Sequence, residues 1–393
     1  MTTVNNKKAV RRKKMVEKED SEIVEWISHN TLPLVFKWLD SPDVLRCCAV
    51  CKLWRDLALD PILWRSVILT GYRLNIPSMA NFLCQRRTCS LKIIDCEFLL
   101  FDDLLLALET MTELRKFAIA PVNVTFMEKI PEYNPHLTSL NANFICGFPG
   151  RHIKLDFLNL LPNITELKIH CDREMHNLCD SLNLSKKLQC LSLTGVTNLN
   201  SLNLENCKIG LNGTLKYLSL GECANLPKSF ADNFIKSLTT LETLRLEDCR
   251  ECYLFDILKN ISTLKNLNRL ELVKVRIECD FDQGLKLCNQ IKILTLVPYP
   301  HRYYIALYNT RIFSCVTSLK HSLNSFTWGF LPTYLTYVEN VLEQPNSVHL
   351  LEDIKQPNKP TFDTLDRLQH LIASQMPNTK VIVGKLAYKT VPF

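Results

Sequence analysis

The chain has 393 residues, of which 47% are hydrophobic and 22% are charged, and this composition excludes an intrinsically disordered protein. Its length exceeds one ordinary domain, so two domains or a repeat array are expected. Residues 1–18 hold seven basic residues and one acidic residue, a net charge of +6 within the chain's +7, which leaves +1 for residues 19–393. A nearly neutral body excludes a protein built to bind a nucleic-acid backbone.

The 17 cysteines are scattered along the chain, and the N-terminus is polar and then basic rather than apolar. We expect no export signal and a reducing compartment, the cytoplasm or the nucleus, where cysteine serves as a small buried residue. The most apolar stretch, 98–108, is interrupted by Asp102 and Asp103. It falls short of the ~18 apolar residues that a membrane span requires, so no membrane partner is expected.

Residues 1–25 are polar and charged, which predicts a disordered basic tail. The run from Lys7 to Lys14 fits a nuclear-import signal. A solvated basic tail explains the same residues, and both interpretations stay open.

Helix signals dominate residues 26–64. Ser41 is expected to cap a helix whose first turn holds Pro42, because proline lacks the N–H that the first turn leaves unpaired. Asp60-Pro61 marks another helix start, and Trp64 ends the segment. The segment also carries a dense aromatic load: Trp26, Phe36, Trp38, Trp54 and Trp64.

The order of residues within this segment is distinctive. It contains Leu32-Pro33, Phe36, Leu39-Asp40, Pro42-Asp43-Val44-Leu45, Val50-Cys51-Lys52, Trp54-Arg55, Asp60-Pro61 and Trp64. This pattern resembles an F-box. A segment so small cannot bury all its apolar side chains alone, so a partner protein is expected to complete its core. The alternative is an ordinary helical subdomain packed on the rest of the chain.

The resemblance implies docking on a Skp-type adaptor and, through it, on a cullin. The residues that match the family's adaptor contacts are Leu32, Pro33, Leu45, Val50, Cys51 and Trp54. Some of these residues belong to the domain's own core in an alternative interpretation.

From residue 64 onward, a template of apolar-x-x-apolar-x-apolar recurs. Its first positions are 64, 88, 114, 137, 164, 188, 215, 241, 267 and 291, at spacings of 23 to 27 residues. This period is typical of leucine-rich repeats. Three residues beyond the third apolar position stand Cys96, Cys223 and Cys249, and a buried side chain there is expected to bond the backbone of the loop that leaves the strand.

The fold class expected is therefore α/β: a leucine-rich repeat solenoid, with parallel strands on its concave face and helices on its convex face, preceded by a small all-α F-box. Phe230, Phe234, Ile235 and Leu238 have the spacing of one such helix. The expected domains are a tail at 1–25, the F-box at 26–70, the repeats at 71–300, and degenerate repeats or a C-terminal cap at 301–393.

Side chains between the template positions are expected to point out of the strand face, because side chains alternate along a strand. Candidate substrate-binding residues there are Tyr217, Arg245, Glu247, Arg269 and Glu271. Arginine and tyrosine are common interface anchors, although only a minority of interface residues carry binding energy and any single position is more often an ordinary solvated one. We expect a protein partner with acidic character facing Arg245 and Arg269, and no nucleic acid, because the charges are of mixed sign.

Metal and catalytic motifs are weak. Cys48 with Cys51 and Cys249 with Cys252 have metal-like spacing, but each pair has a structural explanation in the helix or the repeat template. Neither a phosphate-binding glycine loop nor a hydrolase motif is present. We expect no metal, no cofactor and no catalytic residue.

The resemblance implies a non-catalytic, substrate-recognition subunit of a Skp–cullin–F-box ubiquitin ligase, which presents a protein substrate for ubiquitination and proteasomal degradation. The alternative is a repeat scaffold that binds a protein partner without degrading it.

Overall fold

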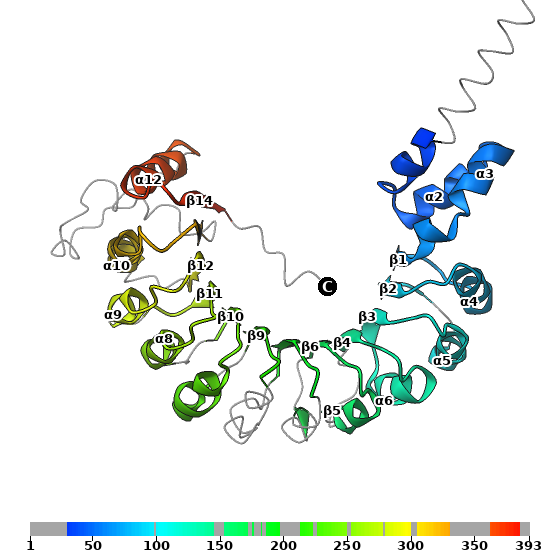
Figure 1. Ribbon diagram of the computed structural model, residues 1–393, viewed down its shortest axis with the longest axis horizontal. Coiled ribbons are helices and arrows are strands. Elements are labelled where there is room, and N and C mark those ends of the chain that lie inside the picture. The colour runs from blue at the N-terminus through cyan, green and yellow to red at the C-terminus, as the bar shows by residue number, and fades with distance from the viewer. Residues whose placement is uncertain are drawn as a thin grey trace, which may run out of the picture. The chain divides into compact units, whose positions relative to one another are not determined.

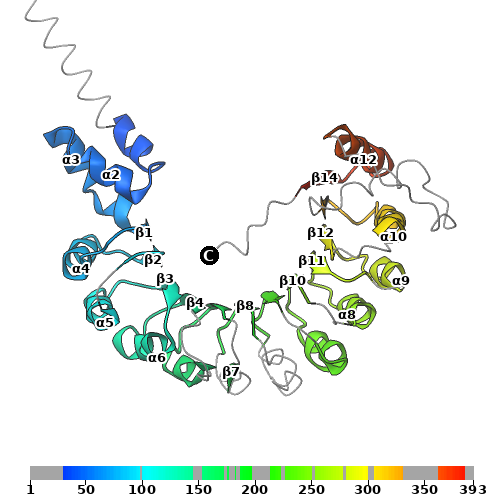
Figure 2. The same cartoon turned by 180° about the vertical axis from the view of Figure 1, so that it is seen from behind.

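The computed structural model describes residues 30–97, 100–144, 153–171, 175–176, 182, 186–196, 213–222, 226–249, 253–277, 280–299, 305–330 and 362–385. The chain divides into two compact units, with the boundary between Ile119 and Ala120. Figures 1 and 2 show both units from opposite sides.

The first unit begins with short helices. Residues 30–36 are helical, and α2 (Ser41–Cys47), α3 (Lys52–Ala58) and the 3-10 helix η1 (Pro61–Trp64) follow. The cap of α2 is Asp40, and the expectation that Ser41 would cap it was wrong. The Asp40 backbone is extended and its carboxylate accepts a hydrogen bond from the Asp43 N–H at 2.9 Å, so Ser41 falls within the first turn. Asp60 caps η1 as expected.

The same unit then contains β1 (Ser66–Thr70), α4 (Ile76–Gln85), β2 (Ser90–Ile94), α5 (Phe101–Thr110) and the start of β3 (Lys116–Val122). Strands β1 and β2 pair in parallel. The Trp64 indole N–H donates to the Ala58 carbonyl at 2.7 Å, and the Thr88 hydroxyl donates to the Trp64 carbonyl at 2.8 Å. The Trp64 ring packs edge-on against Phe82, with centroids 4.7 Å apart. Trp64 therefore joins the helical segment to the first repeat.

The second unit contains a series of similar strands that form one parallel sheet. After α6 (Val124–Tyr133), each strand pairs in parallel with the next one in its sheet. These strands are β4 (Ser139–Phe144), β6 (Glu166–His170), β8 (Cys190–Thr194), β9 (Tyr217–Gly221), β10 (Thr243–Glu247), β11 (Arg269–Val275), β12 (Ile293–Pro298), β13 (Ser325–Phe330) and β14 (Lys380–Lys385). A separate sheet pairs β5 (Ile153–Lys154) with β7 (Met175–His176).

Helical segments connect these strands and cover one side of the sheet (Figure 1). They are η2 (Asp156–Leu160), the π-helical η6 (Phe230–Phe234), η7 (Ile235–Ser237), α8 (Leu254–Ile261), α9 (Phe281–Lys286), α10 (Ile305–Ser318) and α12 (Phe362–Gln375). The helix expected around Phe230 is present, as π-helical and 3-10 turns rather than an α-helix. The leucine-rich repeat fold is confirmed.

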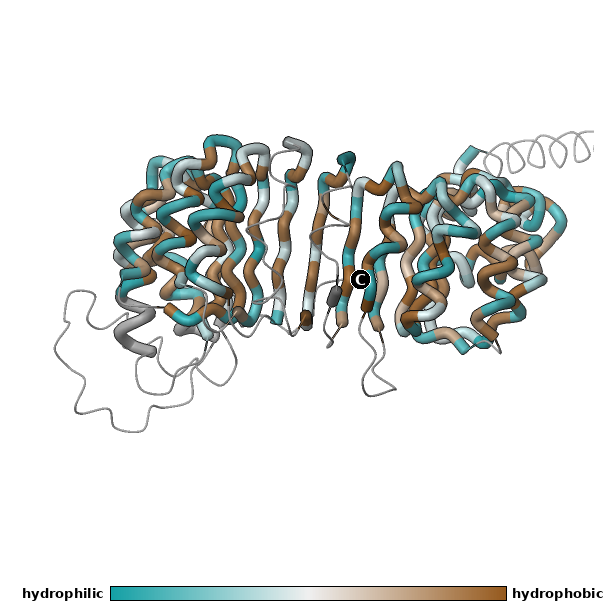
Figure 3. Tube along the Cα trace, turned by 90° about the horizontal axis from the view of Figure 1, so that it is seen from below, coloured by the Kyte–Doolittle hydropathy of each residue, from teal (hydrophilic) through white to brown (hydrophobic). Residues whose placement is uncertain are grey.

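The sequence template and the strand register coincide. Leu191, Leu218, Leu244, Leu270 and Leu294 are cross-strand neighbours, and all are fully buried. Figure 3 shows hydrophobic and hydrophilic residues alternating along the strands. One repeat cannot bury this leucine row alone, so each repeat is stabilised by its neighbours.

The parallel pairing continues past residue 300. Phe326 and Trp328 of β13 are fully buried and face Val381 and Val383 of β14. Valine replaces leucine in β14, and the interval from β13 exceeds one repeat period, which is why the sequence pattern fades there. The stretch 346–354, a further poor match, lies outside the described residues.

Two of the three template cysteines bond the backbone, but the acceptors are strand residues rather than the loop that was expected, and Cys96 is only half-buried. The Cys249 thiol is fully buried and donates to the Leu220 and Glu247 carbonyls at 3.7 and 3.5 Å. The Cys96 thiol donates to the Leu69 and Ile94 carbonyls, each at 3.4 Å. Cys223 lies outside the described residues.

Two residues after the third apolar position of the template, the backbone adopts a left-handed conformation. Most residues at this position are not glycine, so the sequence does not predict it. This position has φ between 49° and 77° at Gly71, Asp95, Gly195, Glu222 and Asp248, and Lys274, at a register shift inside β11, has φ 51°. Glu222 and Asp248 donate their N–H groups to the carbonyls of Glu247 and Val273 on the next strand, at 2.7 and 2.8 Å. Left-handed backbone is unfavourable for residues with a Cβ, so four of these six positions (Asp95, Glu222, Asp248 and Lys274) are strained, and the hydrogen bonds of the strand ladder stabilise them.

We predict that Gly71→Ala lowers the free energy of unfolding of the first unit by about 1 kcal/mol, because alanine disfavours positive φ. A Cβ at Gly71 meets nothing within 4 Å, so the loss reports the backbone alone. Gly384→Ala is the matched control: its Cβ also meets nothing, and its φ is not left-handed. Urea titration followed by tryptophan fluorescence measures both variants, and equal losses would contradict the prediction.

Candidate protein-interaction surfaces

Five large apolar side chains near the start of the first unit stay exposed. They are Leu34, Val35, Trp38, Leu45 and Val50, with exposed fractions of 57, 52, 90, 47 and 61%. Leu34 and Val35 lie in the helix at 30–36, Trp38 follows it, Leu45 lies in α2, and Val50 lies between α2 and α3. We call these five residues the apolar helical set.

The apolar helical set is exposed because the helices are too short to bury it. The inward positions are occupied by Phe36, Val44, Cys47 and Ala58, all buried. The Phe36 ring contacts the half-buried Trp54 ring edge-on, with centroids 5.4 Å apart. The Arg55 Nε donates to the Cys48 carbonyl at 3.0 Å, which fixes α3 against the end of α2. The small core is complete, and the set remains outside it.

A second surface lies on the strand face of the second unit. Arg245 of β10 is the register partner of Glu271 of β11. Its guanidinium donates to the Glu271 carboxylate at 2.5 Å and to the Glu247 carboxylate at 2.6 and 3.2 Å. The Arg269 Nε donates to Glu271 at 2.5 Å. We call Arg245, Glu247, Arg269 and Glu271 the strand-face ion cluster.

Within this cluster the charges compensate one another. Burial opposes the charged form of Arg245, but the hydrogen bonds and charges of Glu247 and Glu271 outweigh it, so the pKa of Arg245 is raised. Glu271 is only 7% exposed and bridges both arginines. Two positive and two negative charges leave little net field. The pairing therefore does not support the acidic partner that the sequence suggested for Arg245 and Arg269.

The neighbouring strand-face groups are also held in unreactive states. Tyr217 of β9 is the register partner of Cys190 in β8, and burial raises the pKa of both, that of Cys190 to about 11. Lys168 and Glu166 form an ion pair at 2.7 Å. A thiol with so high a pKa is protonated near neutral pH and is a poor nucleophile. The arrangement suits contact with a partner rather than bond-making chemistry.

Comparison with known families identifies the helical segment. Residues 29–70 match the family model described as F-box-like. The chain carries an F-box-like domain. In fold, the chain is similar to the crystal structure of the yeast Rad7 and Elc1 complex, at 14% identity and a TM-score of 0.45, covering 100% of this chain and 97% of that one. It is also similar to a leucine-rich repeat protein of Leptospira interrogans, at 15% identity and a TM-score of 0.41, covering 82% and 78%.

The six adaptor residues expected from the resemblance divide into two groups in the F-box-like domain. Leu45, Val50 and Cys51 are exposed, whereas Leu32, Pro33 and Trp54 are half-buried. The Cys51 thiol accepts a hydrogen bond from the Trp54 N–H at 3.4 Å and caps α3. Trp54 packs on Phe36, so part of its surface belongs to the domain's own core.

Leu34, Val35 and Trp38 are exposed but were missing from the sequence-based site, and the positions of Leu34 and Trp38 have a simple explanation. Leu34 and Trp38 are each two positions from Phe36, about 200° around a helix, and four positions from each other. Once Phe36 is placed inside, Leu34 and Trp38 fall on the opposite side. The spacing of Leu34 and Trp38 relative to the buried Phe36 was therefore the sequence signal that could have identified them as exposed.

Three of the cysteines with metal-like spacing have other bonding partners in the structure. The Cys48 thiol donates to the Val44 carbonyl at 3.8 Å, Cys51 caps α3 and Cys249 bonds the backbone. Cys252 lies outside the described residues. The eleven cysteines of the described residues are thiols rather than disulfides, and these residues contain no group of three His, Cys, Asp or Glu arranged to hold a metal. Among the helices described, none is long and apolar enough to cross a membrane.

We predict that Glu271→Gln lowers the free energy of unfolding by about 2 kcal/mol, because it removes a charged acceptor and leaves Arg269 without its carboxylate. Glu242→Gln is the control, because its ion pair with Lys216 is about half exposed and such pairs contribute at most about 1 kcal/mol. Chemical denaturation of the two variants measures the difference. Equal losses would mean that the cluster adds nothing beyond a surface ion pair.

Proposed function

We propose that this chain is a substrate-recognition subunit of a Skp–cullin–F-box ubiquitin ligase. Its F-box-like domain docks on a Skp-type adaptor, and through the adaptor on a cullin, while the repeats hold a protein substrate. The observation that carries the proposal is the apolar helical set within the matched residues 29–70.

The energetics favour a protein partner for this set. Full burial of an exposed large apolar side chain contributes about 1.5–3 kcal/mol. Four of the five side chains are already about half buried and Trp38 is 90% exposed, so covering the set would offset part of the cost of association. Clusters of exposed apolar residues on a small domain are typical of interaction sites. An adaptor that covers them would complete the hydrophobic layer that the short helices lack.

The substrate side of the proposal is the strand face. We assign substrate contact to Tyr217, Arg245, Glu247, Arg269 and Glu271. Since the arginines are already paired, a substrate would need to offer both hydrogen-bond donors and acceptors to this surface, rather than an acidic run. The chain makes no bond itself; holding a substrate lysine near a charged conjugating enzyme raises the effective concentration of the reactants.

We expect Leu45→Asp with Val50→Asp to weaken adaptor binding by at least about tenfold, because a carboxylate at either position must be desolvated on docking. The measurement is co-purification of the Skp-type adaptor with the full chain, followed by titration. Leu106→Asp on α5 is the matched control, since Leu106 is exposed to a similar degree, 57%, and lies outside residues 29–70.

Wild-type adaptor binding by the Leu45/Val50 double variant would refute the docking assignment. The degradative role has a separate test. A partner captured by the repeats should accumulate when the cullin is inactivated, and unchanged partner levels would favour a non-degradative scaffold.

Trp38 has its own expected outcome. It is 90% exposed, and tryptophans at interfaces commonly carry much of the binding energy. Trp38→Ala should reduce adaptor affinity by about tenfold or more while leaving the thermal unfolding midpoint unchanged, because the ring contributes little to the folded core. Calorimetric titration and a melting curve separate the two effects, and an unaltered affinity would remove Trp38 from the proposed interface.

We place the protein in the cytoplasm or the nucleus. The support is the basic run from Lys7 to Lys14 and the scattered cysteines of the sequence. Both compartments are compatible with the proposed ligase role.

A further inference from the structure

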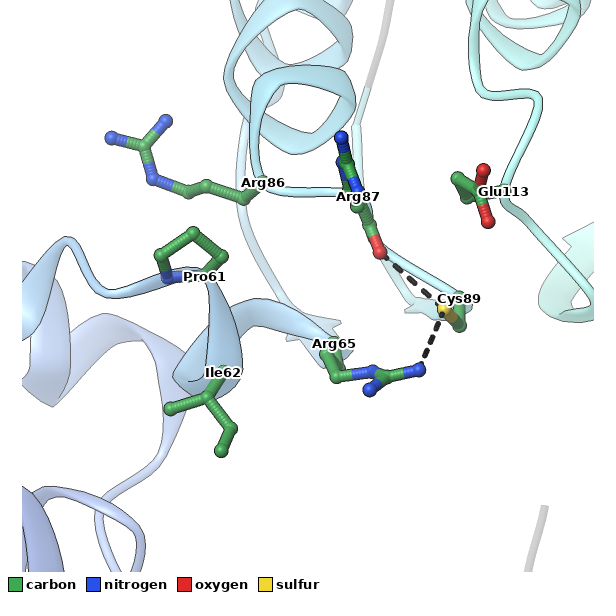
Figure 4. Close-up of a pocket in the computed structure, with 7 residues that line it drawn as sticks. All are labelled: Pro61, Ile62, Arg65, Arg86, Arg87, Cys89 and Glu113. Carbon is green, nitrogen blue, oxygen red and sulfur yellow. Dashed lines mark hydrogen bonds between the residues drawn. The ribbon is translucent and has the colours of Figure 1, made fainter.

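A pocket of about 350 Å³ opens on the first unit (Figure 4). Its wall combines η1, the end of α4 and the connections that lead into β1, β2 and β3. The lining residues are Pro61, Ile62, Arg65, Arg86, Arg87, Cys89 and Glu113. Their side chains are three cations, one anion and a small apolar surface.

Backbone hydrogen bonds fix the floor of this pocket. The N–H groups of Cys89 and Ser90 donate to the Arg65 carbonyl at 2.9 and 3.0 Å. The N–H groups of Arg115 and Lys116 donate to the Cys89 carbonyl at 2.8 and 3.0 Å. These bonds hold the backbone at Arg65 and Cys89 in the strand ladder, so this backbone need not be ordered when a ligand binds.

In the part of the chain that the structure describes, the three arginines that line the pocket are not paired with carboxylates, unlike the arginines of the strand face. In the strand-face ion cluster, both arginines bond carboxylates. Within the residues that the structure describes, no salt bridge involves Arg65, Arg86 or Arg87, nor does Glu113 reach any of them. The Arg65 guanidinium donates a hydrogen bond to the Cys89 sulfur at 3.8 Å. The pocket therefore keeps a surplus of positive charge.

Arg86 is held in place by its surroundings. Its guanidinium lies 3.7 Å over the Phe82 ring and donates to the Phe82 carbonyl at 3.1 Å. Burial lowers the pKa of Arg86, which means that its charge is poorly solvated and gains from a nearby anion. In Figure 4, Arg86 extends past Pro61 while Arg65 extends towards Cys89.

We propose that this pocket binds an acidic or phosphorylated side chain of a protein partner, with a neighbouring aliphatic side chain against Pro61 and Ile62. Guanidinium groups bind carboxylate and phosphate through paired hydrogen bonds. The volume lies at the low end of the ~300–1,000 Å³ that ligand pockets span, which suits one or two side chains. The lining contains no aromatic ring on which a nucleic-acid base would stack, so a peptide is the favoured ligand.

Cys89 provides a reporter inside the pocket for the full-length protein. Anionic and cationic methanethiosulfonate reagents are reacted in parallel, and the modification of each cysteine is followed by mass spectrometry. The anionic-to-cationic rate ratio at Cys89 should exceed that at the exposed Cys51 by about tenfold, because a basic cleft concentrates anions. Arg65→Gln with Arg87→Gln should abolish the difference. Both arginines are exposed, and Arg86 is left in place to preserve its packing.

The second measurement tests the ligand. Capped peptides containing Leu-phosphoserine-Leu, Leu-Glu-Leu or Leu-Ser-Leu are added before alkylation with neutral iodoacetamide. The phosphoserine or the glutamate peptide, and not the serine peptide, should protect Cys89, and whichever of the two protects identifies the source of the anion. The Arg65/Arg87 variant should lose the protection.

Three outcomes would overturn the proposal: equal rate ratios at Cys89 and Cys51, no protection by either acidic peptide, or equal protection by inorganic phosphate or a single-stranded oligonucleotide. The proposal does not depend on adaptor docking. Adaptor co-purification of the Arg65/Arg87 variant, scored in the same preparation, separates failure at the pocket from failure of the proposed function.

Discussion

The structure depends on the side-by-side stacking of a single leucine row. Each strand contributes a buried leucine, such as Leu244, to a layer that no repeat could form alone. Parallel hydrogen bonding keeps the leucines of neighbouring strands in register. Because stability of this kind is a sum of nearest-neighbour terms, the outward side chains are free to vary. The strand face can therefore evolve contacts without disturbing the fold that presents them.

The first unit buries its apolar side chains in a different way. Its short helices form a minimal core around Phe36, and Trp64 ties that core to the first strand through two hydrogen bonds and the Phe82 contact. The helices cannot also cover Leu34, Trp38, Leu45 and Val50. The domain therefore combines exposed apolar side chains with a buried tryptophan that links it to the first repeat.

Much of the fold was predictable because leucine spacing reports burial directly. The leucine positions from Leu188 to Leu296, the strand-face alternation and the Cys249 bond all followed from the sequence pattern. The pairing of Arg245 with Glu247 and Glu271 was not predictable, because the outward positions were known but the rotamers that close the ion pairs were not. Strand β14 was obscured by valines and an irregular interval, and the Asp40 cap by a competing serine beside it. The pocket is lined by residues from separate segments between 61 and 113. None of these segments contains a recognisable motif, so the sequence did not predict the pocket.

The left-handed strand exits have a practical consequence. At Asp95, Glu222, Asp248 and Lys274 the ladder imposes a conformation that costs an L-amino acid about 1 kcal/mol, whereas Gly71 and Gly195 adopt it freely. Most of these positions carry a residue other than glycine, so the chain forgoes the stability that glycine would add there. Glycine introduced at an exposed exit such as Glu222 would relieve the backbone strain there and give a more stable chain for crystallisation.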